Sequence, residues 1–488
     1  MKITRGGRLT GDLTEDVARL TSSSEHDPYI ADAVIEINLA HILALVKGGY
    51  LSKEEGRWLS LALNEMLGKV VAVPPNMEDV HMVIEEEVTK KVGPDLGGRL
   101  HTGKSRNDQV ATAVRMRLRE FLIDILGEAN SLQAALFRRA SQSVEVIMPG
   151  FTHLQHAQPV TVAHHLLAYF DMFSRDFERL RECYGRVNMS PMGSAALAGT
   201  GFRINRELTA SYLGFDGLVE NTMDAVSSRD FALEAASALS ILMVHVSRFS
   251  EEIVLWSSQE FGYIDLPDDH SSTSSIMPQK KNPVTAEVLR AKSADVFGEL
   301  AAMVGIMKSL PLAYNLDMQE LTVHLWRACE IVSLSLRVLT DLVDKLKFNE
   351  ARLRELVRRD SSVATELADT LVREGGVTFR KAHQVVGSIA RDLAVAGSSL
   401  TQEDPEKLAE MVSTLSGKKL SMDSIKAAVD PVSNVNVRST TGGPSFTEVR
   451  RMLVDRSRSL SSQEAALSGI RIILGKSKET MQSDLSAL

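Results

Sequence analysis

Residues 274–283 bring together side chains that could move a proton and bind an anion. The segment reads Ser-Ser-Ile-Met-Pro-Gln-Lys-Lys-Asn-Pro, and Pro278 favours a bend because proline lacks a backbone donor and clashes with a preceding helical turn. Ser274 before the bend could accept a proton, while Lys280 and Asn282 after it stabilise developing oxyanion charge. A polar surface loop without chemistry is the alternative, since most such loops have none.

A second polar run, residues 98–109, comes directly before a predicted long helix and contains Ser105, Arg106, Asn107 and Asp108. The amides and the positive dipole end of a helix N-terminus suit a carboxylate ligand. The alternative is a capping loop, in which Ser105, Asn107 and Asp108 only satisfy the first turn of the helix. The residue types alone leave both interpretations open.

Thr152 and His153 follow a Pro-Gly break that could expose them, and histidine readily exchanges a proton near neutral pH. A structural role is the alternative for a lone histidine. The neighbouring histidines could be mistaken for metal ligands, but no cysteines accompany them and the His-Glu-x-x-His pattern is absent from the sequence. We therefore expect no metal site. The neighbouring histidines are His156, His164 and His165.

Two groups of acidic residues complete the candidates. Glu78 and Asp79 precede His81, and His81 and Glu85 are four residues apart, which places both on one helix face. An exposed polar helix start is the alternative. Glu287 lies in a predicted helix after the 274–283 segment, where a carboxylate could orient an imidazole. By itself, Glu287 would be interpreted as a surface residue.

The elements that must position these residues are predicted to be helices. Apolar residues recur at steps of three and four over residues 114–136, and further long helices are predicted over 231–256, 285–307 and 321–346. We see no convincing alternating strand segments and no Asn-Gly hairpin signal. The sequence predicts an all-α fold with an N-terminal helical domain (1–106), a central bundle of long helices (107–358) and a small helical C-terminal domain (359–488). Helices this long predict an oligomer, because a monomer leaves apolar surface exposed.

The bulk composition excludes several classes of partner. The chain has 488 residues, a net charge of -8 and 44% hydrophobic residues, which is typical of a soluble globular protein and gives no basic field for nucleic acid. The apolar window 235–247 is shorter than the roughly 20 residues that a membrane helix needs. Cys183 and Cys329 are too few for a disulfide framework, and the first residues lack a signal-peptide core. We expect a cytoplasmic protein with reduced thiols.

Residues 274–283 resemble the signature loop of the fumarase/aspartase superfamily, Gly-Ser-Ser-x-Met-Pro-x-Lys-x-Asn, with Thr273 at the usual glycine. The His-Thr-Gly-x-Ser-Arg-Asn-Asp-Gln run at 101–109 resembles one member, the argininosuccinate lyase family, and distinguishes it from fumarases, aspartases and adenylosuccinate lyases. The resemblance extends over nearly the full chain. Further matching segments are residues 6–8, 78–81, 152–155, 198–200, 221–227, 256–262, 314–320, 379–383 and 442–443.

The resemblance implies a fold and a reaction. It implies a homotetramer with a helical core, in which three regions from three subunits build each site. The implied reaction is β-elimination of argininosuccinate to arginine and fumarate through an aci-carboxylate, the last step of arginine biosynthesis and a urea cycle-type reaction. It implies no metal and no organic cofactor.

The resemblance also assigns roles to residues. Ser274 is the implied base, with Lys280 stabilising its alkoxide and the aci-carboxylate, and His153, held by Glu287, is the implied acid. The implied substrate-binding residues are Ser23, His81, Ser105, Arg106, Asn107, Thr152, Ser275, Asn282, Tyr314 and Gln319.

Five positions depart from the argininosuccinate lyase pattern, and two alternatives follow. Lys104 replaces an arginine, Ser228 an aspartate and Leu316 an arginine. Leu321 and Thr322 stand where the family often has Asp-Lys, and that lysine contacts substrate in the family. One alternative is a superfamily lyase that acts on a different amine-bearing succinyl compound. The other is a non-catalytic structural relative, as in the delta crystallins, but every residue of the implied catalytic set is present.

Overall fold

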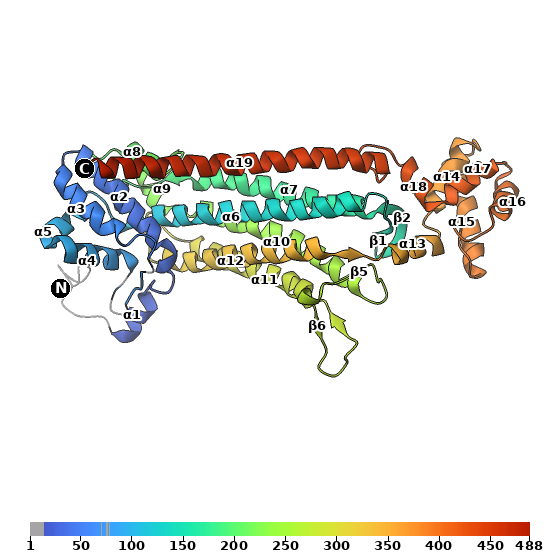
Figure 1. Ribbon diagram of the computed structural model, residues 1–488, viewed down its shortest axis with the longest axis horizontal. Coiled ribbons are helices and arrows are strands. Elements are labelled where there is room, and N and C mark those ends of the chain that lie inside the picture. The colour runs from blue at the N-terminus through green and yellow to red at the C-terminus, as the bar shows by residue number, and fades with distance from the viewer. Residues whose placement is uncertain (1–13, 70, 75–76, 78) are drawn as a thin grey trace.

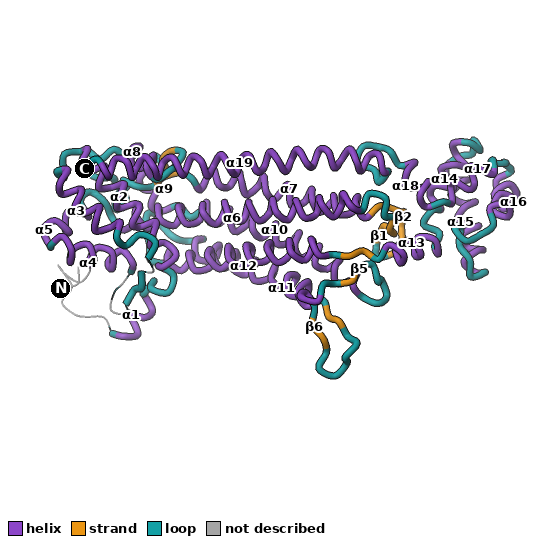
Figure 2. The backbone as a smooth tube through the Cα atoms, viewed as in Figure 1, coloured by secondary structure: helices purple, strands orange, loops and turns teal. Residues whose placement is uncertain are grey.

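The computed structural model describes residues 14–488 except 70, 75–76 and 78, so the matches at residues 6–8 and Glu78 lie outside the described residues. Long helices run side by side along the long axis of an elongated molecule (Figures 1 and 2). This architecture confirms the predicted mainly helical fold. The long helices are α6 (Arg106–Gln142), α7 (Val162–Val187), α10 (Asp230–Ser257), α11 (Val284–Met307), α12 (Asp317–Lys345) and α19 (Phe446–Ser486).

Apolar faces explain why these helices form one bundle. α6 packs against α7, α12 and α19, while α10 packs against α7, α11 and α12. Their buried side chains form one continuous core, from Ile30 near the N-terminus to Leu485 near the C-terminus. Helices α6, α10, α11 and α12 confirm the four predicted long helices. Because these helices are long, polar residues at the two ends of one helix lie in opposite parts of the molecule.

The N-terminal part consists of shorter helices that cover one end of the bundle (Figure 1). α4 begins where the Asp79 carboxylate caps it by accepting the Met82 N–H at 2.9 Å. This cap places Asp79 and His81 beside the start of α6. The elements are α1 (Glu15–Thr21), the 3₁₀ helix η2 (Asp27–Ile30), α2 (Ala31–Lys47), α3 (Lys53–Asn64), α4 (Val80–Val92), α5 (Pro94–Gly97) and η3 (Gly98–His101).

The C-terminal part has its own apolar core, formed by residues between Val363 and Val429. The last helix, α19, leaves this part and packs along α6 and α7 (Figure 1). The domain division stays a proposal, and the packing of α19 favours a C-terminal unit that ends near Arg438 rather than at residue 488. The smaller helices are α13 (Glu350–Arg359), α14 (Ala364–Arg373), α15 (Phe379–Val395), α16 (Pro405–Ser416), α17 (Met422–Val429) and α18 (Pro431–Val437).

The structure contains short strands that the sequence analysis did not find. β1 (Ile147–Thr152) and β2 (Gln155–Thr161) form an antiparallel hairpin with an irregular register between Pro149 and Phe151. The prediction was wrong here because Pro149 and Gly150 interrupt any alternating pattern. β6 (Ser272–Thr273) and β7 (Lys281–Asn282) form a second hairpin. The remaining elements are β3 (Met189–Ser190), β4 (Gly217–Leu218), α8 (Arg206–Tyr212), α9 (Thr222–Ser227), β5 (Ile264–Asp265), η4 (Asp268–His270) and β8 (Lys347–Phe348).

Two segments are long and apolar enough to cross a membrane when judged by length and composition alone: Asp27–Lys47 and Asp230–Ser257. Their most apolar windows are 78% and 56% buried within the protein. Packing against other helices accounts for this composition, as expected for helices at the centre of a bundle. Cys183 and Cys329 are both unpaired and buried.

Candidate active site

A cavity of about 1830 Å³ opens between the N-terminal helices and the adjoining ends of α6 and α12. It is lined from α1, the segment before η2, α4, the start of α6 and the start of α12. Residues far apart in the sequence therefore meet in one place. The predicted substrate-binding residues in this lining are Ser23, His81, Ser105, Arg106, Asn107, Tyr314 and Gln319.

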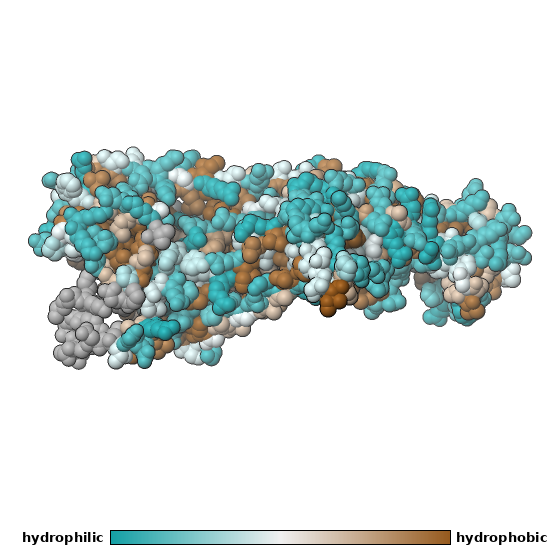
Figure 3. Space-filling view, turned by 60° about the horizontal axis from the view of Figure 1, so that its bottom comes forward, coloured by the Kyte–Doolittle hydropathy of each residue, from teal (hydrophilic) through white to brown (hydrophobic). Residues whose placement is uncertain are grey.

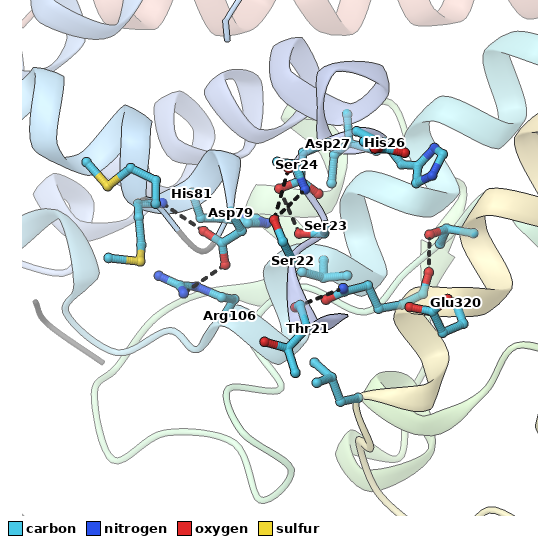
Figure 4. Close-up of a pocket in the computed structure, with 18 of the residues that line it drawn as sticks. Thr21, Ser22, Ser23, Ser24, His26, Asp27, Asp79, His81, Arg106 and Glu320 are labelled. Atoms are coloured by element: carbon cyan, nitrogen blue, oxygen red, sulfur yellow. Dashed lines mark hydrogen bonds and ion pairs between the residues drawn. The ribbon is translucent and has the colours of Figure 1, made fainter. Parts of the chain in front are cut away.

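An ion pair joins α4 to α6 at this cavity. Arg106 Nη1 lies 2.8 Å from Asp79 Oδ2, as Figure 4 shows. Burial raises the pKa of Asp79, while the nearby Arg106 guanidinium opposes that change. The first residue of α6 is thereby fixed against the capping residue of α4. The pair supports the prediction that the helix start is more than a capping loop.

Asp27 is a cavity residue that the sequence analysis missed. Its Oδ2 accepts hydrogen bonds from Ser23 Oγ at 2.9 Å and from the Val80 N–H at 2.7 Å (Figure 4). Burial raises the pKa of Asp27 to about 6. The carboxylate can bind a positively charged amine of a ligand, because it lines the same cavity as Ser23 and Arg106. Its position at the start of η2 resembles an ordinary helix start in the sequence.

The start of α6 both caps the helix and faces the cavity. Ser105 Oγ accepts the Asn107 N–H at 3.3 Å, and Asp108 Oδ1 accepts the Ser105 N–H at 3.0 Å. Asp108 Oδ2 also accepts the Gly193 and Ala195 amides, and burial raises its pKa to about 6. The capping interpretation and the ligand-binding interpretation are therefore compatible, because Ser105 both caps the helix and lines the cavity.

His81 is 6% exposed and lines the cavity, and neither of its ring nitrogens has a hydrogen-bond partner among the described residues. Burial lowers the pKa of His81 well below its ordinary value, and the nearby Arg106 and Lys104 lower it further. A neutral imidazole results, which can both donate to and accept from a ligand. Lys104, also buried, bonds to Asn38 Oδ1, and burial lowers its pKa to about 7.

Arg229 lies outside the cavity lining and was not singled out from the sequence; it is buried near Tyr314, with 1% of its surface exposed. Its Nη1 donates to the Ser228 carbonyl at 2.8 Å, while Nε and Nη2 have no partner among the described residues. Burial lowers the pKa of Arg229 to about 10. These two nitrogens form one edge of the guanidinium fork, the geometry that binds a carboxylate through two hydrogen bonds. The sequence signal was weak, since Arg229 follows the departing residue Ser228.

Ser274 lies in a different place, in the loop between β6 and β7 that projects from the bundle (Figure 1). Its Oγ accepts the backbone N–H groups of Ile276 at 3.2 Å and Met277 at 3.1 Å. Two donors on one hydroxyl oxygen stabilise negative charge there, which favours a serine alkoxide. Lys280 Nζ bonds to Asn282 Oδ1 in the same loop, and Ser275 is exposed at its tip.

Thr152 and His153 occupy a third place, at the turn between β1 and β2, where both are exposed. His153 and Leu154 have φ values of 56° and 55°, as a two-residue hairpin turn with right-handed strand twist requires. Glu287 is exposed on the first turn of α11. No hydrogen bond or ion pair joins His153 to Glu287 among the described residues. The predicted orienting contact is therefore not made within one chain.

Rigid helices separate the three places. α6 has 37 residues, which span roughly 55 Å, and it runs from Arg106 at the cavity towards the hairpin that carries His153. α11 has 24 residues, which span roughly 36 Å, and it runs between the Ser274 loop and the segment that carries Tyr314. One chain holds every predicted residue but does not bring the three groups together (Figure 1).

A possible metal-binding cluster lies near the Ser274 loop. One ligand atom from each of Asp269, His270 and Asp341 lies within 4.8 Å of the others. The Lys345 ammonium is 2.5 Å from Asp269 Oδ2 and 2.6 Å from Asp341 Oδ2, so a cation already neutralises both carboxylates. This arrangement gives no reason to propose a metal.

Two of the departing residues, Leu316 and Thr322, line the cavity. Thr322 Oγ1 donates to the Gln319 carbonyl at 2.7 Å, so its hydroxyl proton is already engaged within α12. Gln319 Nε2 in turn donates to the Thr21 carbonyl at 3.3 Å, which ties α12 to the end of α1. Neither departing residue supplies a charge to this part of the cavity.

Comparisons with known proteins identify the class that this fold and site define. A family model described as Lyase matches residues 7–298. The solved structure of an EDDS lyase variant with bound fumarate has a TM-score of 0.86 and 27% identity, covering 99% of this chain and 97% of that chain. A class II fumarase from Schistosoma mansoni has a TM-score of 0.70 at 19% identity, covering 83% and 90%. The fold is that of the fumarase/aspartase superfamily of lyases.

The more specific match concerns one family within that class. An argininosuccinate lyase from Methanothrix thermoacetophila is 47% identical over 465 residues, covering 95% of this chain and 94% of the relative. Another from Methanocaldococcus jannaschii is 43% identical, covering 93% of each. A family model described as Argininosuccinate lyase C-terminal matches residues 361–436. The chain belongs to the argininosuccinate lyase family, which confirms the resemblance found in the sequence.

Proposed function

We propose that the protein cleaves argininosuccinate into arginine and fumarate by β-elimination. The observation that carries this proposal is the cavity, in which seven predicted substrate-binding residues, Arg106 among them, meet beside Asp27. Arginine carries an ammonium and a carboxylate, and the cavity offers a carboxylate and hydrogen-bond donors to match them. Identity of 42% to 47% with argininosuccinate lyases supports the same substrate.

The reaction proceeds in two proton transfers. Ser274 removes a proton from the carbon next to one carboxylate of the succinyl group, and the electron pair spreads into that carboxylate. Ser274 acts as an alkoxide after its own proton has passed to solvent, and the amides of Ile276 and Met277 stabilise that alkoxide. Lys280 and Asn282 stabilise the dianionic carboxylate. The carbon–nitrogen bond then breaks, and His153 supplies the proton that the departing guanidinium nitrogen takes up.

The site is assembled from several subunits of a homotetramer in this proposal. The separation of the three groups of residues along one chain supports it, and so does an apolar surface on the bundle. Figure 3 shows apolar side chains gathered along the middle of the molecule. Contact between copies would bury this surface, as in other long-helix bundles. The large apolar side chains that are exposed on α10, α11 and α12, here called the apolar stripe, are Ile241, Val244, Val288, Phe297, Val304 and Leu334.

A cytoplasmic location and a role in arginine biosynthesis complete the proposal. The argininosuccinate lyase relatives support the role in arginine biosynthesis. The buried, unpaired cysteines are consistent with a reducing compartment.

A second candidate function has one supporting observation. Leu316 and Thr322 line the cavity at positions where the family has a cation and supply none, which would suit a succinyl compound carrying a different amine. The solved EDDS lyase, which has a TM-score of 0.86, is named after a compound other than argininosuccinate. Lyases of this fold are therefore named after different compounds.

Fumarate release, followed by ultraviolet absorbance, distinguishes the two candidates. Purified protein is given argininosuccinate, with adenylosuccinate, aspartate and malate in parallel. Fumarate and arginine from argininosuccinate alone are the expected result. Preferred turnover of another compound would support the second candidate, and no turnover by a folded tetramer would favour a structural protein.

A further inference from the structure

An interaction between the hairpin and the C-terminal unit has no assigned role. His156 on β2 lies two residues after the turn that carries His153, and its Nδ1 is 2.5 Å from Asp360 Oδ2. Asp360 follows α13 and begins the C-terminal unit. We infer that His156 and Asp360 form a clamp that positions Thr152 and His153 for the reaction, an inference that rests on the proposed function.

The turn needs such a clamp because its backbone is strained. His153 and Leu154 both adopt positive φ values, and neither is glycine. A left-handed residue with a side chain costs about 1 to 2 kcal/mol, and the surrounding structure must hold it in place. The turn side chains of His153 and Leu154 are exposed, so no packing around them holds the turn. The constraint must therefore come from the strands on either side.

The clamp fixes β2 through two kinds of contact. The His156 ring packs edge-on against Phe151 of β1 at a centroid distance of 5.0 Å. Phe151 in turn contacts Phe261 at 5.7 Å and Tyr263 at 6.2 Å. Because Asp360 accepts a hydrogen bond, Nδ1 of His156 carries the proton. The ring is thereby held by an aromatic contact on one side and a carboxylate on the other.

Asp360 is a fixed partner for this ring. Its Oδ1 accepts the Ser362 N–H at 2.9 Å, and its carbonyl accepts Thr401 Oγ1, also at 2.9 Å. Thr401 belongs to the loop before α16, within the C-terminal unit. A rigid connection thus runs from the C-terminal unit through Asp360 and His156 to the turn. His156 acts through Thr152 and His153, so its role is positioning.

Two substitutions of His156 separate its hydrogen bond from its packing. His156→Phe keeps a ring against Phe151 and removes the donor, whereas His156→Asn keeps a donor close to the position of Nδ1. We expect His156→Phe to lower kcat by about tenfold to a hundredfold with a smaller change in KM, as a misplacement of about 1 Å does. His156→Asn should recover most of this loss.

A matched control exists within the bundle. His165 also packs edge-on against an aromatic ring, Trp256, at 5.0 Å and bonds to a carboxylate, Glu252, but it lies on α7. His165→Phe should leave kcat unchanged while altering thermal stability as much as His156→Phe does. Equal losses of kcat in both variants would show a general structural effect and would overturn the inference.

Hydrogen–deuterium exchange of residues 147–161 provides a test that does not depend on turnover. His156→Phe should speed exchange in this hairpin, and His156→Asn should restore it. Unchanged exchange in His156→Phe would reject the clamp even in an active enzyme. Wild-type protein that releases no fumarate while its hairpin responds as expected would reject the proposed function and leave the mechanical part of the inference standing.

Discussion

Ser274 carries the proposed base chemistry, and its two amide hydrogen bonds explain how a weakly acidic hydroxyl can serve. Ser274→Ala removes the oxygen that takes the proton. We expect kcat to fall by about a hundredfold to ten-thousandfold, the range of acid–base catalysis, with an unchanged oligomer. Stopped assays of fumarate release and light scattering measure both quantities. Substantial residual turnover would remove Ser274 from the role of base.

Asp27 predicts how binding depends on pH. With a pKa of about 6, its carboxyl becomes neutral as the pH falls through that value and then no longer attracts an ammonium group. KM for argininosuccinate should therefore rise about tenfold between about pH 7 and about pH 5. Asp27→Asn keeps the acceptor for Ser23 and should give a high KM with a flat pH profile. An identical pH dependence in the variant would assign the titration to another group.

At the scale of residues, the sequence predicted which motif residues line the cavity better than it predicted which residues are buried or lack hydrogen-bond partners. Arg106, Asn107 and Tyr314 could be found because they lie in recognisable motifs, and the structure places all three in the cavity. Asp27 and Arg229 could not be found, because their significance comes from burial and from unpaired or shared hydrogen bonds. Neither property can be read from neighbouring residues in the chain.

The loop between β6 and β7 is exposed, which suits access of substrate to Ser274, and we expect it to add little to the stability of the fold. Only two residue pairs join its strands, and Ile276 at its tip is 86% exposed. Replacing residues 274–280 with an Asn-Gly turn would connect the paired Thr273 and Lys281 directly. We expect the free energy of unfolding to change by less than about 0.5 kcal/mol, as for other surface changes, while turnover is lost. Chemical denaturation and the fumarate assay test this.

A large loss of stability in that variant would show that the loop packs against the protein and is not a free catalytic element. At this scale, the sequence predicted the long helices α6, α10, α11 and α12 from their apolar residues, but it did not predict α7. The β1–β2 hairpin escaped because Pro149 and Gly150 obscure its pattern. The return of α19 to the bundle is a long-range contact, and local periodicity does not specify the partner of a helix.

In the proposed tetramer, the apolar stripe is the surface that subunits bury against one another. Phe297 lies within it on α11 and is 41% exposed. Phe297→Asp would place a charge in the proposed contact between subunits, where desolvation makes an unpaired charge unfavourable. We expect a smaller species in light scattering, with retained helical circular dichroism and lost turnover.

Ile472→Asp is the control for that prediction, because Ile472 is 56% exposed on α19, outside the apolar stripe. It should leave the oligomer and turnover intact. A Phe297→Asp variant that stays tetrameric would place the contact between subunits on another face. The sequence predicted an oligomer from helix length, but it could not predict which helix faces form the contact between subunits.

The lengths of α6 and α11, 37 and 24 residues, have a consequence for inheritance. Together these helices keep Arg106 and Ser274 in different places along one chain, so in the proposed tetramer a single site draws them from different subunits. Two alleles, one damaged at Arg106 and the other at Ser274, would each encode an inactive enzyme. Expressed together, they would form mixed tetramers in which some sites receive only intact groups. Cells carrying both defective alleles would then grow without added arginine, although cells carrying either one alone would not.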